Sequence, residues 1–187
     1  MLYTAVLARH PQTRSDAVRG VVAHVRRMEN ATFSLTYVLH GDITRLRISP
    51  PRHPRRADGL WQHTCFEIFV AEKGQQSYWE FDFSPSGEWA VYALKSYRDG
   101  EAIEDDGLDP RISVRSAANS FELGASVRLD CLSSIQPGGV LRLGLSAVVE
   151  ENDGTLSYWA LNHPTGKPDF HHPDSFALEL ALPDESD

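Results

Sequence analysis

The chain of 187 residues has little cysteine and no long apolar run. Its two cysteines, Cys65 and Cys131, are too few for a disulfide framework, and in a reducing compartment both are expected to be free thiols. No apolar run approaches the ~20 residues of a transmembrane helix. Arg9 and His10 interrupt the N-terminal residues before the apolar core of a signal peptide could form. These absences predict a cytoplasmic protein that does not interact with a membrane.

The sequence also lacks the common motifs of nucleotide-binding proteins and of hydrolases. It contains no GxGxxG, no GxxxxGK[ST], no GxSxG and no HExxH. Helical patterning is nearly absent as well, apart from one short turn expected at 130–136. We therefore expect neither a nucleotide-binding α/β fold nor a hydrolase that uses the serine elbow.

Positive charge is scarce, and it is unevenly distributed. The net charge is −8, which argues against a nucleic-acid partner because phosphate binding needs a concentrated positive surface. Residues 1–60 contain 10 basic and 4 acidic residues, whereas residues 61–187 contain 8 and 22. This asymmetry predicts two parts of one domain that attract each other, with an interaction face as the alternative.

Alternation of apolar and polar residues dominates the chain and is typical of strands with one buried face. It is clearest at 33–39, 79–83, 141–145 and 176–182, and it recurs near 19–27, 43–48, 65–71, 88–94, 111–117, 121–129 and 156–161. Turn sequences such as Asn152-Asp153-Gly154 separate these runs. We expect an all-β antiparallel sandwich of about ten or eleven strands, jelly-roll or immunoglobulin-like, formed by one domain over 1–187 with a frayed tail at 183–187.

One strand, within LWQHTCFEIFV, places a carboxylate among apolar side chains. Glu67 shares a face with Cys65 and Phe69, and Trp61 precedes the strand. A carboxylate buried there must find a partner. Glu67 is therefore either a paired or edge-exposed acid, or an acceptor for sugar hydroxyls.

A second strand, Tyr78-Trp79-Glu80-Phe81-Asp82-Phe83, carries two acids on one face. Glu80 and Asp82 are about 7 Å apart along the strand. Together with Glu67 they could perform the acid-base chemistry of a glycoside hydrolase, which would need a raised pKa on one member of the pair. The alternative is a polar outer strand face.

A third cluster lies in the segment from Tyr158 to Asp174, which is rich in histidine, aspartate and proline. His163, Asp169 and His171 are residue types that bind zinc or iron, although their spacing matches no common metal motif. The alternative is a loop fixed by proline whose side chains bond the backbone. Whether a metal is bound stays open.

Two loops are strongly charged. Pro50–Arg56 is basic and could contact an acidic protein partner, or it could be a solvated loop. Residues 95–109 are predicted to form an acidic loop that lacks the spacing of an EF-hand but could hold calcium weakly.

As a set, three stretches resemble the superfamily of DOMON-like domains and family 9 carbohydrate-binding modules. They are LWQHTCFEIFV, YWEFDFSPSGEWAVY and YWALNHPTGKPDFHHPDSFALEL, and the likeness covers most of residues 15–182. The resemblance implies a β-sandwich that holds a sugar between tryptophans, with calcium common in the module family and haem bound by other members. It also implies that Trp61 and Glu67 bind ligand and that Trp159 is the second aromatic.

The sequence thus predicts a module that binds a carbohydrate-like small molecule without altering it. Trp61 and Trp159 lie beside loops rich in His, Asn and Pro, and we expect them to stack on a sugar ring across one hollow. Glu67, Asn162, His163 and His171 are the expected polar contacts. No cofactor is expected apart from calcium, and the alternatives are a hydrolase or metalloenzyme acting on a glycan, or a protein-interaction module.

Overall fold

The computed structural model describes residues 2–28, 32–105, 108, 110–129 and 138–182, and these residues form twelve antiparallel strands. In chain order the strands are β1 (Leu2–Arg9), β2 (Val18–Arg27), β3 (Thr32–Gly41), β4 (Cys65–Glu72), β5 (Tyr78–Phe83), β6 (Trp89–Ser96), β7 (Asp99–Ala102), β8 (Arg111–Ala117), β9 (Ser120–Arg128), β10 (Val140–Glu150), β11 (Leu156–Ala160) and β12 (Leu178–Ala181). The predicted all-β class is confirmed.

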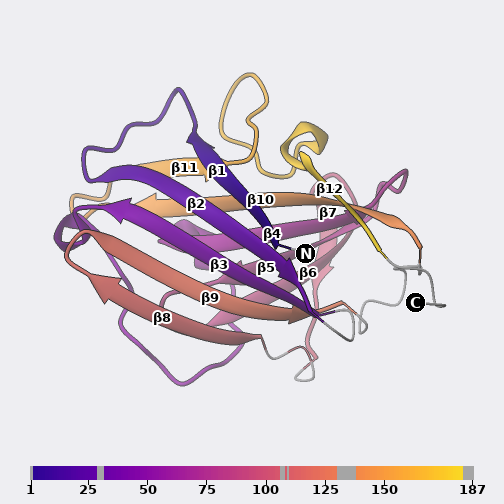
Figure 1. Cartoon of the computed structure of the whole chain (residues 1–187), viewed down its shortest axis with the longest axis horizontal. Helices are drawn as coiled ribbons and strands as arrows, with labels where there is room; N and C mark the ends of the chain where they lie inside the picture. The colour runs from indigo at the N-terminus through magenta and orange to yellow at the C-terminus, as the bar shows by residue number, and fades with distance from the viewer. Residues whose placement is uncertain (1, 29–31, 106–107, 109, 130–137, 183–187) are drawn as a thin grey trace.

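The strands form two layers that are joined through β1. The hydrogen-bonded order is β7-β6-β5-β4-β10-β11-β1-β2-β3-β9-β8, with β12 added to β10. Ala8 and Arg9 of β1 pair with β11, whereas Leu2–Leu7 pair with β2. Figure 1 shows β1, β2, β3, β9 and β8 side by side in front of the layer that contains β10, β4, β5 and β6. The sheet folds over itself at β1, so its two halves face each other.

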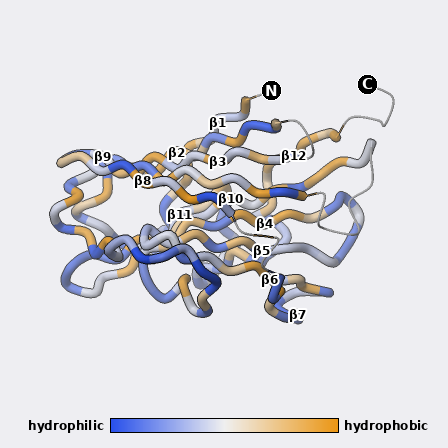
Figure 2. The backbone as a smooth tube through the Cα atoms, turned by 90° about the horizontal axis from the view of Figure 1, so that it is seen from below, coloured by the Kyte–Doolittle hydropathy of each residue, from blue (hydrophilic) through white to orange (hydrophobic). Residues whose placement is uncertain are grey.

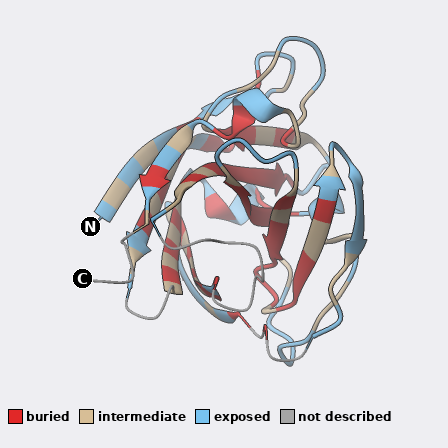
Figure 3. Ribbon diagram, turned by 90° about the vertical axis from the view of Figure 1, so that its right-hand side faces the viewer, coloured by how far each residue is buried: buried red, intermediate tan, exposed pale blue. Residues whose placement is uncertain are grey.

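The core lies between these layers and explains the alternation in the sequence. Apolar side chains from both layers pack there, including Phe66, Phe81 and Phe121, and the hydroxyl of Tyr37 donates to the Glu67 carbonyl at 2.6 Å. Alternating hydropathy along the strands is visible in Figure 2, and buried residues are concentrated in the strands in Figure 3. The outer strand β8 is mostly exposed.

The structure corrects several predicted elements. The first strand, β1, was not predicted, and β7 lies within the predicted acidic loop at 95–109. Ile43–Arg45 is a short 3-10 helix rather than part of a strand, because Asp42 caps it and Leu46 closes the turn. The predicted turn at 130–136 and the tail at 183–187 lie outside the described residues. Among the described segments, no helix has the length and apolarity of a membrane span.

The predicted attraction between the basic and acidic parts of the chain is present as three sets of ion pairs. Arg45 pairs with Glu151 and Arg47 with Glu150. Two arginines of the Pro50–Arg56 loop bind Glu88, Arg52 at 3.4 Å and Arg55 at 2.8 Å. Much of the charge of this loop is therefore matched within the molecule.

Candidate functional site

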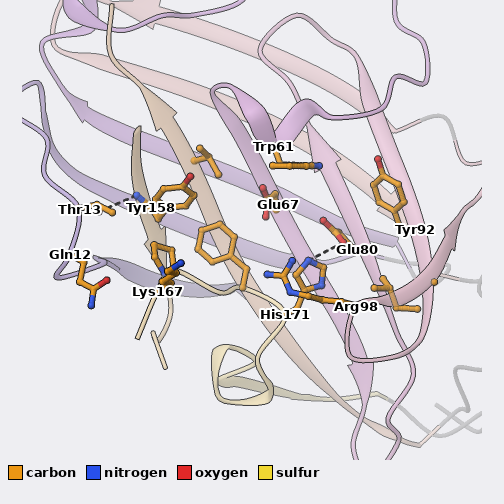
Figure 4. Close-up of a pocket in the computed structure, with 15 residues that line it drawn as sticks. Gln12, Thr13, Trp61, Glu67, Glu80, Tyr92, Arg98, Tyr158, Lys167 and His171 are labelled. Atoms are coloured by element: carbon orange, nitrogen blue, oxygen red, sulfur yellow. Dashed lines mark hydrogen bonds and ion pairs between the residues drawn. The ribbon is translucent and has the colours of Figure 1, made fainter. Parts of the chain in front are cut away.

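A pocket of about 640 Å³ lies on the outer face of the layer that contains β4, β5, β6, β10 and β11. Its volume is within the roughly 300–1,000 Å³ of small-molecule sites. The strands form its floor, and four connecting segments form its walls. Its lining residues are Gln12, Thr13, Trp61, Glu67, Glu80, Tyr92, Leu94, Arg98, Gly100, Val148, Tyr158, Lys167, Pro168, Phe170 and His171. Figure 4 shows these residues as sticks around the pocket.

Strand alternation brings the acids of the two predicted clusters together on this floor. Phe66 and Phe81 point into the core, so Glu67 on β4 and Glu80 on β5 point outward. The register places Glu67 opposite Asp82 and Phe69 opposite Glu80. The carboxyl groups that the sequence placed on separate strands therefore belong to one cluster.

These three acids are buried, and burial is the main influence on their charge. Glu67 is 2% exposed, Glu80 7% and Asp82 0%. Loss of water raises the pKa of Glu67 and Asp82 well above the ordinary range, and the neighbouring acids raise it further for both. Burial raises the pKa of Glu80 to about 7, although Arg98 opposes this.

Few groups stabilise the charged form of this cluster. The hydroxyl of Ser146 donates to Glu67 Oε2 at 3.2 Å. Glu67 Oε1 and both carboxylate oxygens of Asp82 have no hydrogen-bond partner in the described part of the chain. Such groups take a proton, a cation or a ligand donor when they are buried.

His171 forms the next part of the wall and is fixed from both sides. Its Nδ1 lies 2.9 Å from the Tyr78 hydroxyl, and its Nε2 is 3.8 Å from Glu80 Oε2. Burial, with a further contribution from Arg98, lowers the pKa of His171 to about 4. The imidazole is therefore neutral near pH 7, and it offers the pocket a hydrogen-bonding ring rather than a charge.

Arg98 and Asp169 hold the loop after β11 against the turn between β6 and β7. Arg98 Nη2 donates to Asp169 Oδ1 at 2.9 Å, and the Tyr97 hydroxyl donates to Asp169 Oδ2 at 2.6 Å. These hydrogen bonds, with the burial of Phe170, place the loop over the pocket. The guanidinium group of Arg98 thus has its own counter-ion.

Aromatic rings supply much of the remaining wall. Trp61 lies in the short 3-10 helix η2 (Leu60–Gln62), and its side chain is largely uncovered, because the residue is 53% exposed. Tyr92, Tyr158 and Phe170 line the same hollow. Figure 4 shows Trp61 beyond Glu67, with Tyr158 on one side of the pocket and Tyr92 on the other. The exposed indole leaves a flat apolar surface available to a ligand.

The prediction that Trp61 and Trp159 face each other across one hollow is wrong. Trp159 is 5% exposed and belongs to the core, where its Nε1 donates to the Ser157 hydroxyl at 3.0 Å. The register with β10 pairs Trp159 with Ala147, a core residue, and Tyr158 with Val148, which lines the pocket. The aromatic side chain that β11 contributes to the pocket is therefore Tyr158.

Of the four predicted polar contacts, two line the pocket and two do not. Glu67 and His171 line the pocket together with Trp61. Asn162 instead donates to the Asp174 carbonyl at 3.1 Å, and His163 Nε2 lies 2.8 Å from the Ala8 carbonyl. Both side chains hydrogen-bond backbone carbonyl groups, and neither is among the lining residues of this pocket.

The structure also changes which residues could hold a metal. Among the described residues, the donor atoms of His163, Asp169 and His171 do not form a group that could hold a metal ion. Donor atoms of Cys65, Glu67 and Asp82 instead lie within 4.8 Å of one another, and all three residues are buried. Thiolate and carboxylate donors suit zinc, although burial and Asp82 raise the pKa of the Cys65 thiol well above its ordinary range.

Sequence reasoning missed several pocket residues that come from distant segments. Gln12 and Thr13 reach the pocket because His10 N donates to the Tyr158 carbonyl at 2.8 Å and fixes this segment beside β11. Arg98 and Lys167 carry no local signal of a shared site. Tyr92 could have been found, since it shares the outward face of its strand with Leu94 in an otherwise apolar run.

Comparison with known proteins adds a clear likeness in structure. No protein-family model and no curated protein matches the sequence. A candidate carbohydrate-binding protein from Bacteroides uniformis has a similar structure, with a TM-score of 0.70 and 14% identity over 96% of this chain and 86% of that one.

Two structures of family 9 carbohydrate-binding modules from Caldicellulosiruptor kristjanssonii are also similar. One, in complex with cellotriose, has a TM-score of 0.60 and 12% identity over 100% of this chain and 85% of that one. The other, in complex with glucose, has a TM-score of 0.53 and 14% identity over 97% and 86%. The chain therefore has a fold like that of family 9 modules, as the resemblance implied. The resemblance to DOMON-like domains stays a prediction.

Proposed function

We propose that the pocket on the outer face of β4, β5, β6, β10 and β11 binds a carbohydrate and leaves it chemically unchanged. The observation that carries this proposal is the exposed indole of Trp61 beside the carboxyl groups of Glu67 and Glu80. A sugar ring presents an apolar C–H face and polar edges, which an aromatic ring and carboxyl groups match respectively. The similar structures that contain cellotriose and glucose support the same ligand class.

In this proposal each wall of the pocket has a distinct role. Trp61 stacks on the sugar, and Tyr158 or Phe170 covers the opposite side. Glu67, Glu80 and His171 provide hydrogen bonds to hydroxyl groups, while Gln12 and Thr13 contact the rim. Tyr158 takes the place first assigned to Trp159, because it is the residue of β11 that lines the pocket.

The test is a calorimetric titration of the protein with a panel of mono- and oligosaccharides. We expect Trp61→Ala to weaken binding by about 2 kcal/mol, a loss typical of a central aromatic contact, while the unfolding midpoint hardly changes. Trp159→Phe is the matched control, because it alters a core ring and should leave the affinity unchanged. Wild-type affinity in Trp61→Ala would contradict the assignment.

Hydrolysis of the bound glycan is the second candidate, favoured by the carboxyl groups of Glu67 and Glu80 on one pocket floor. The raised pKa of Glu80, about 7, would suit a general acid. Chromatography of the oligosaccharide after long incubation separates the two functions. Intact oligosaccharide supports binding alone, and shortened products that disappear with Glu80→Gln would support hydrolysis.

A further inference from the structure

The floor of the pocket carries more acid than the surrounding residues neutralise. Glu67 and Glu80 line the pocket, and the fully buried Asp82 lies on the same face of the sheet, opposite Glu67 in the strand register. Three buried oxygen atoms, Glu67 Oε1 and both of Asp82, have no hydrogen-bond partner among the described residues. A buried carboxyl group without a donor or counter-ion either takes up a proton, as the raised pKa values of Glu67 and Asp82 indicate, or binds a cation. The site is therefore suited to a positively charged partner.

The basic groups near the pocket do not supply this partner. Arg98 is bound to Asp169 at 2.9 Å, and its effect on Glu80 does not overcome the effect of burial. His171 lies closest to Glu80, but its pKa of about 4 makes it neutral near pH 7. Lys167 lies with Gln12 and Tyr158 on the other side of the pocket in Figure 4. Within the described chain, no ion pair joins a basic side chain to Glu67 or Asp82.

The walls of the pocket favour a cation as well. Trp61, Tyr92, Tyr158 and Phe170 line it, and the faces of aromatic rings attract an ammonium group electrostatically. Aromatic walls above an acidic floor are a general arrangement for binding amines, because the rings and the carboxylates act on the same charge. The neutral hydroxyl groups of a simple sugar would use only the hydrogen-bonding capacity of this floor.

We infer that the ligand is an amino sugar, a sugar that carries a free, protonated primary amine directed at Glu80 and Glu67. The inference rests on the proposed function and names its ligand class. The sugar ring stacks on Trp61, and the ammonium group donates to the carboxyl groups of Glu80 and Glu67. Its positive charge takes the place of the proton that burial favours on these acids, and it also acts on Asp82, which lies opposite Glu67 in the strand register. Glu80 is the outer contact, because it is more accessible than Glu67.

The experiment compares three sugars with the same ring by calorimetry at about pH 7, where a free amine is still mostly protonated and Glu80, whose pKa is about 7, is partly ionised. The sugars are glucosamine, N-acetylglucosamine and glucose, and a chelator excludes bound metal ions. Because one charge-assisted hydrogen bond contributes more than a neutral one, we expect glucosamine to bind about tenfold more tightly than the other two. Ethylamine is the fourth ligand and should bind much more weakly than glucosamine.

Isosteric variants assign the preference to the acids. Glu80→Gln and Glu67→Gln should each reduce the preference for glucosamine over glucose at least about threefold while thermal melts show a folded protein. The matched control is Glu122→Gln, which removes a negative charge from β9 in the other half of the sheet and should keep the preference. Two independent variants keep the test valid if one of them does not fold.

The outcomes separate the inference from the proposed function. Equal binding of glucose and glucosamine would overturn the amino-sugar inference and leave sugar binding intact. A preference for glucosamine that survives both glutamine variants would overturn the role of the acids, and equally tight binding of ethylamine would overturn the role of the ring. If no saccharide in the wider panel binds, glucosamine included, the proposed function itself is overturned.

Discussion

Two groups of buried acids in this protein differ in what surrounds them. Glu88, Glu150 and Glu151 are each ion-paired with at least one arginine from residues 45–55. Glu67 and Asp82 are buried to a similar degree, yet they have no ion pair with an arginine or lysine in the described chain. We call the first set the paired acids and the second, with Glu80, the pocket acids.

The comparison shows that burial alone does not fix the charge of an acid. Burial acts to raise the pKa of Glu88, but hydrogen bonds from Arg55 and Ser86 and the charge of Arg52 lower the pKa below its ordinary value. At Glu80 burial prevails over Arg98, and the pKa rises to about 7. Glu88 therefore contributes to stability as an anion, whereas Glu67 and Glu80 line the pocket and are left available to a ligand.

The largest expected effect is on the paired acids. The double variant Arg52→Ala/Arg55→Ala should lower the free energy of unfolding near pH 7 by about 2 kcal/mol, because buried Glu88 loses both cations. The effect is smaller than for a fully buried pair, since both arginines are more than half exposed. Urea unfolding measures it, and adding Glu88→Gln should restore most of the loss.

The sign of the pH dependence checks this interpretation. The folded-state pKa of Glu88 is lowered, so its contribution is present above the unfolded-state pKa and is lost as the pH falls through the folded-state pKa. The difference in the free energy of unfolding between wild type and the double variant should therefore become smaller as the pH falls. If the free energy of unfolding of the double variant lies within about 0.5 kcal/mol of the wild-type value near pH 7, the distinction between the paired acids and the pocket acids is contradicted.

A smaller effect with the opposite sign is expected for the pocket acids. The pKa of Glu80 is raised from 4.5 to about 7, so its stabilising contribution is complete below pH 4.5 and is lost as the pH rises through about 7. Glu80→Gln does not titrate. Relative to wild type, it should gain stability as the pH rises, by roughly 1–2 kcal/mol between about pH 4 and pH 6.

The measurement for Glu80 is a set of urea unfolding curves between about pH 4 and pH 8. The charged and titratable groups that face Glu80 are Cys65, Glu67, Tyr78, Asp82, Tyr92, Arg98 and His171. His171, with its pKa lowered to about 4, contributes the opposite slope in both proteins. A variant that becomes less stable than wild type as the pH rises would show that Glu80 is charged and stabilised there.

The smallest effect is expected for an acid on the surface. Lys73 Nζ lies 2.9 Å from Glu179 Oε2, and both side chains are more than half exposed. Lys73→Ala should change the free energy of unfolding by less than about 0.5 kcal/mol, because water screens the pair. Thermal unfolding at low and high salt checks this. A loss of unfolding free energy comparable with that of the arginine double variant would show that this surface ion pair stabilises the fold as much as the ion pairs of Glu88 do.

The sequence was most informative where a rule depends on neighbouring residues. Alternation at 65–71 and 79–83 predicted that Glu67 and Asp82 lie on the opposite faces of their strands from Phe66 and Phe81, and the structure agrees. The same rule failed at Tyr158 and Trp159, because both are aromatic and the pattern alone does not say which face is the core. Pairing of Trp159 with Ala147 in β10 decides it.

Contacts between distant segments decided the rest of the candidate site. Glu67 meets Ser146 through the pairing of β4 with β10, and Arg98 meets Asp169 across two loops. Whether a buried acid receives an arginine depends on such contacts, as the difference between Glu88 and Asp82 shows. No local pattern in the sequence contains this information.

The amino-acid sequence by itself determined an all-β chain, the position of most strands and the residues that share a strand face, because side-chain direction along a strand repeats every two residues. Only the tertiary structure decided which outward residues form one pocket, that Tyr158 rather than Trp159 belongs to it, and which acids have arginine partners. The physical reason is that strand pairing and loop packing join residues far apart in the chain, and these contacts fix burial and charge.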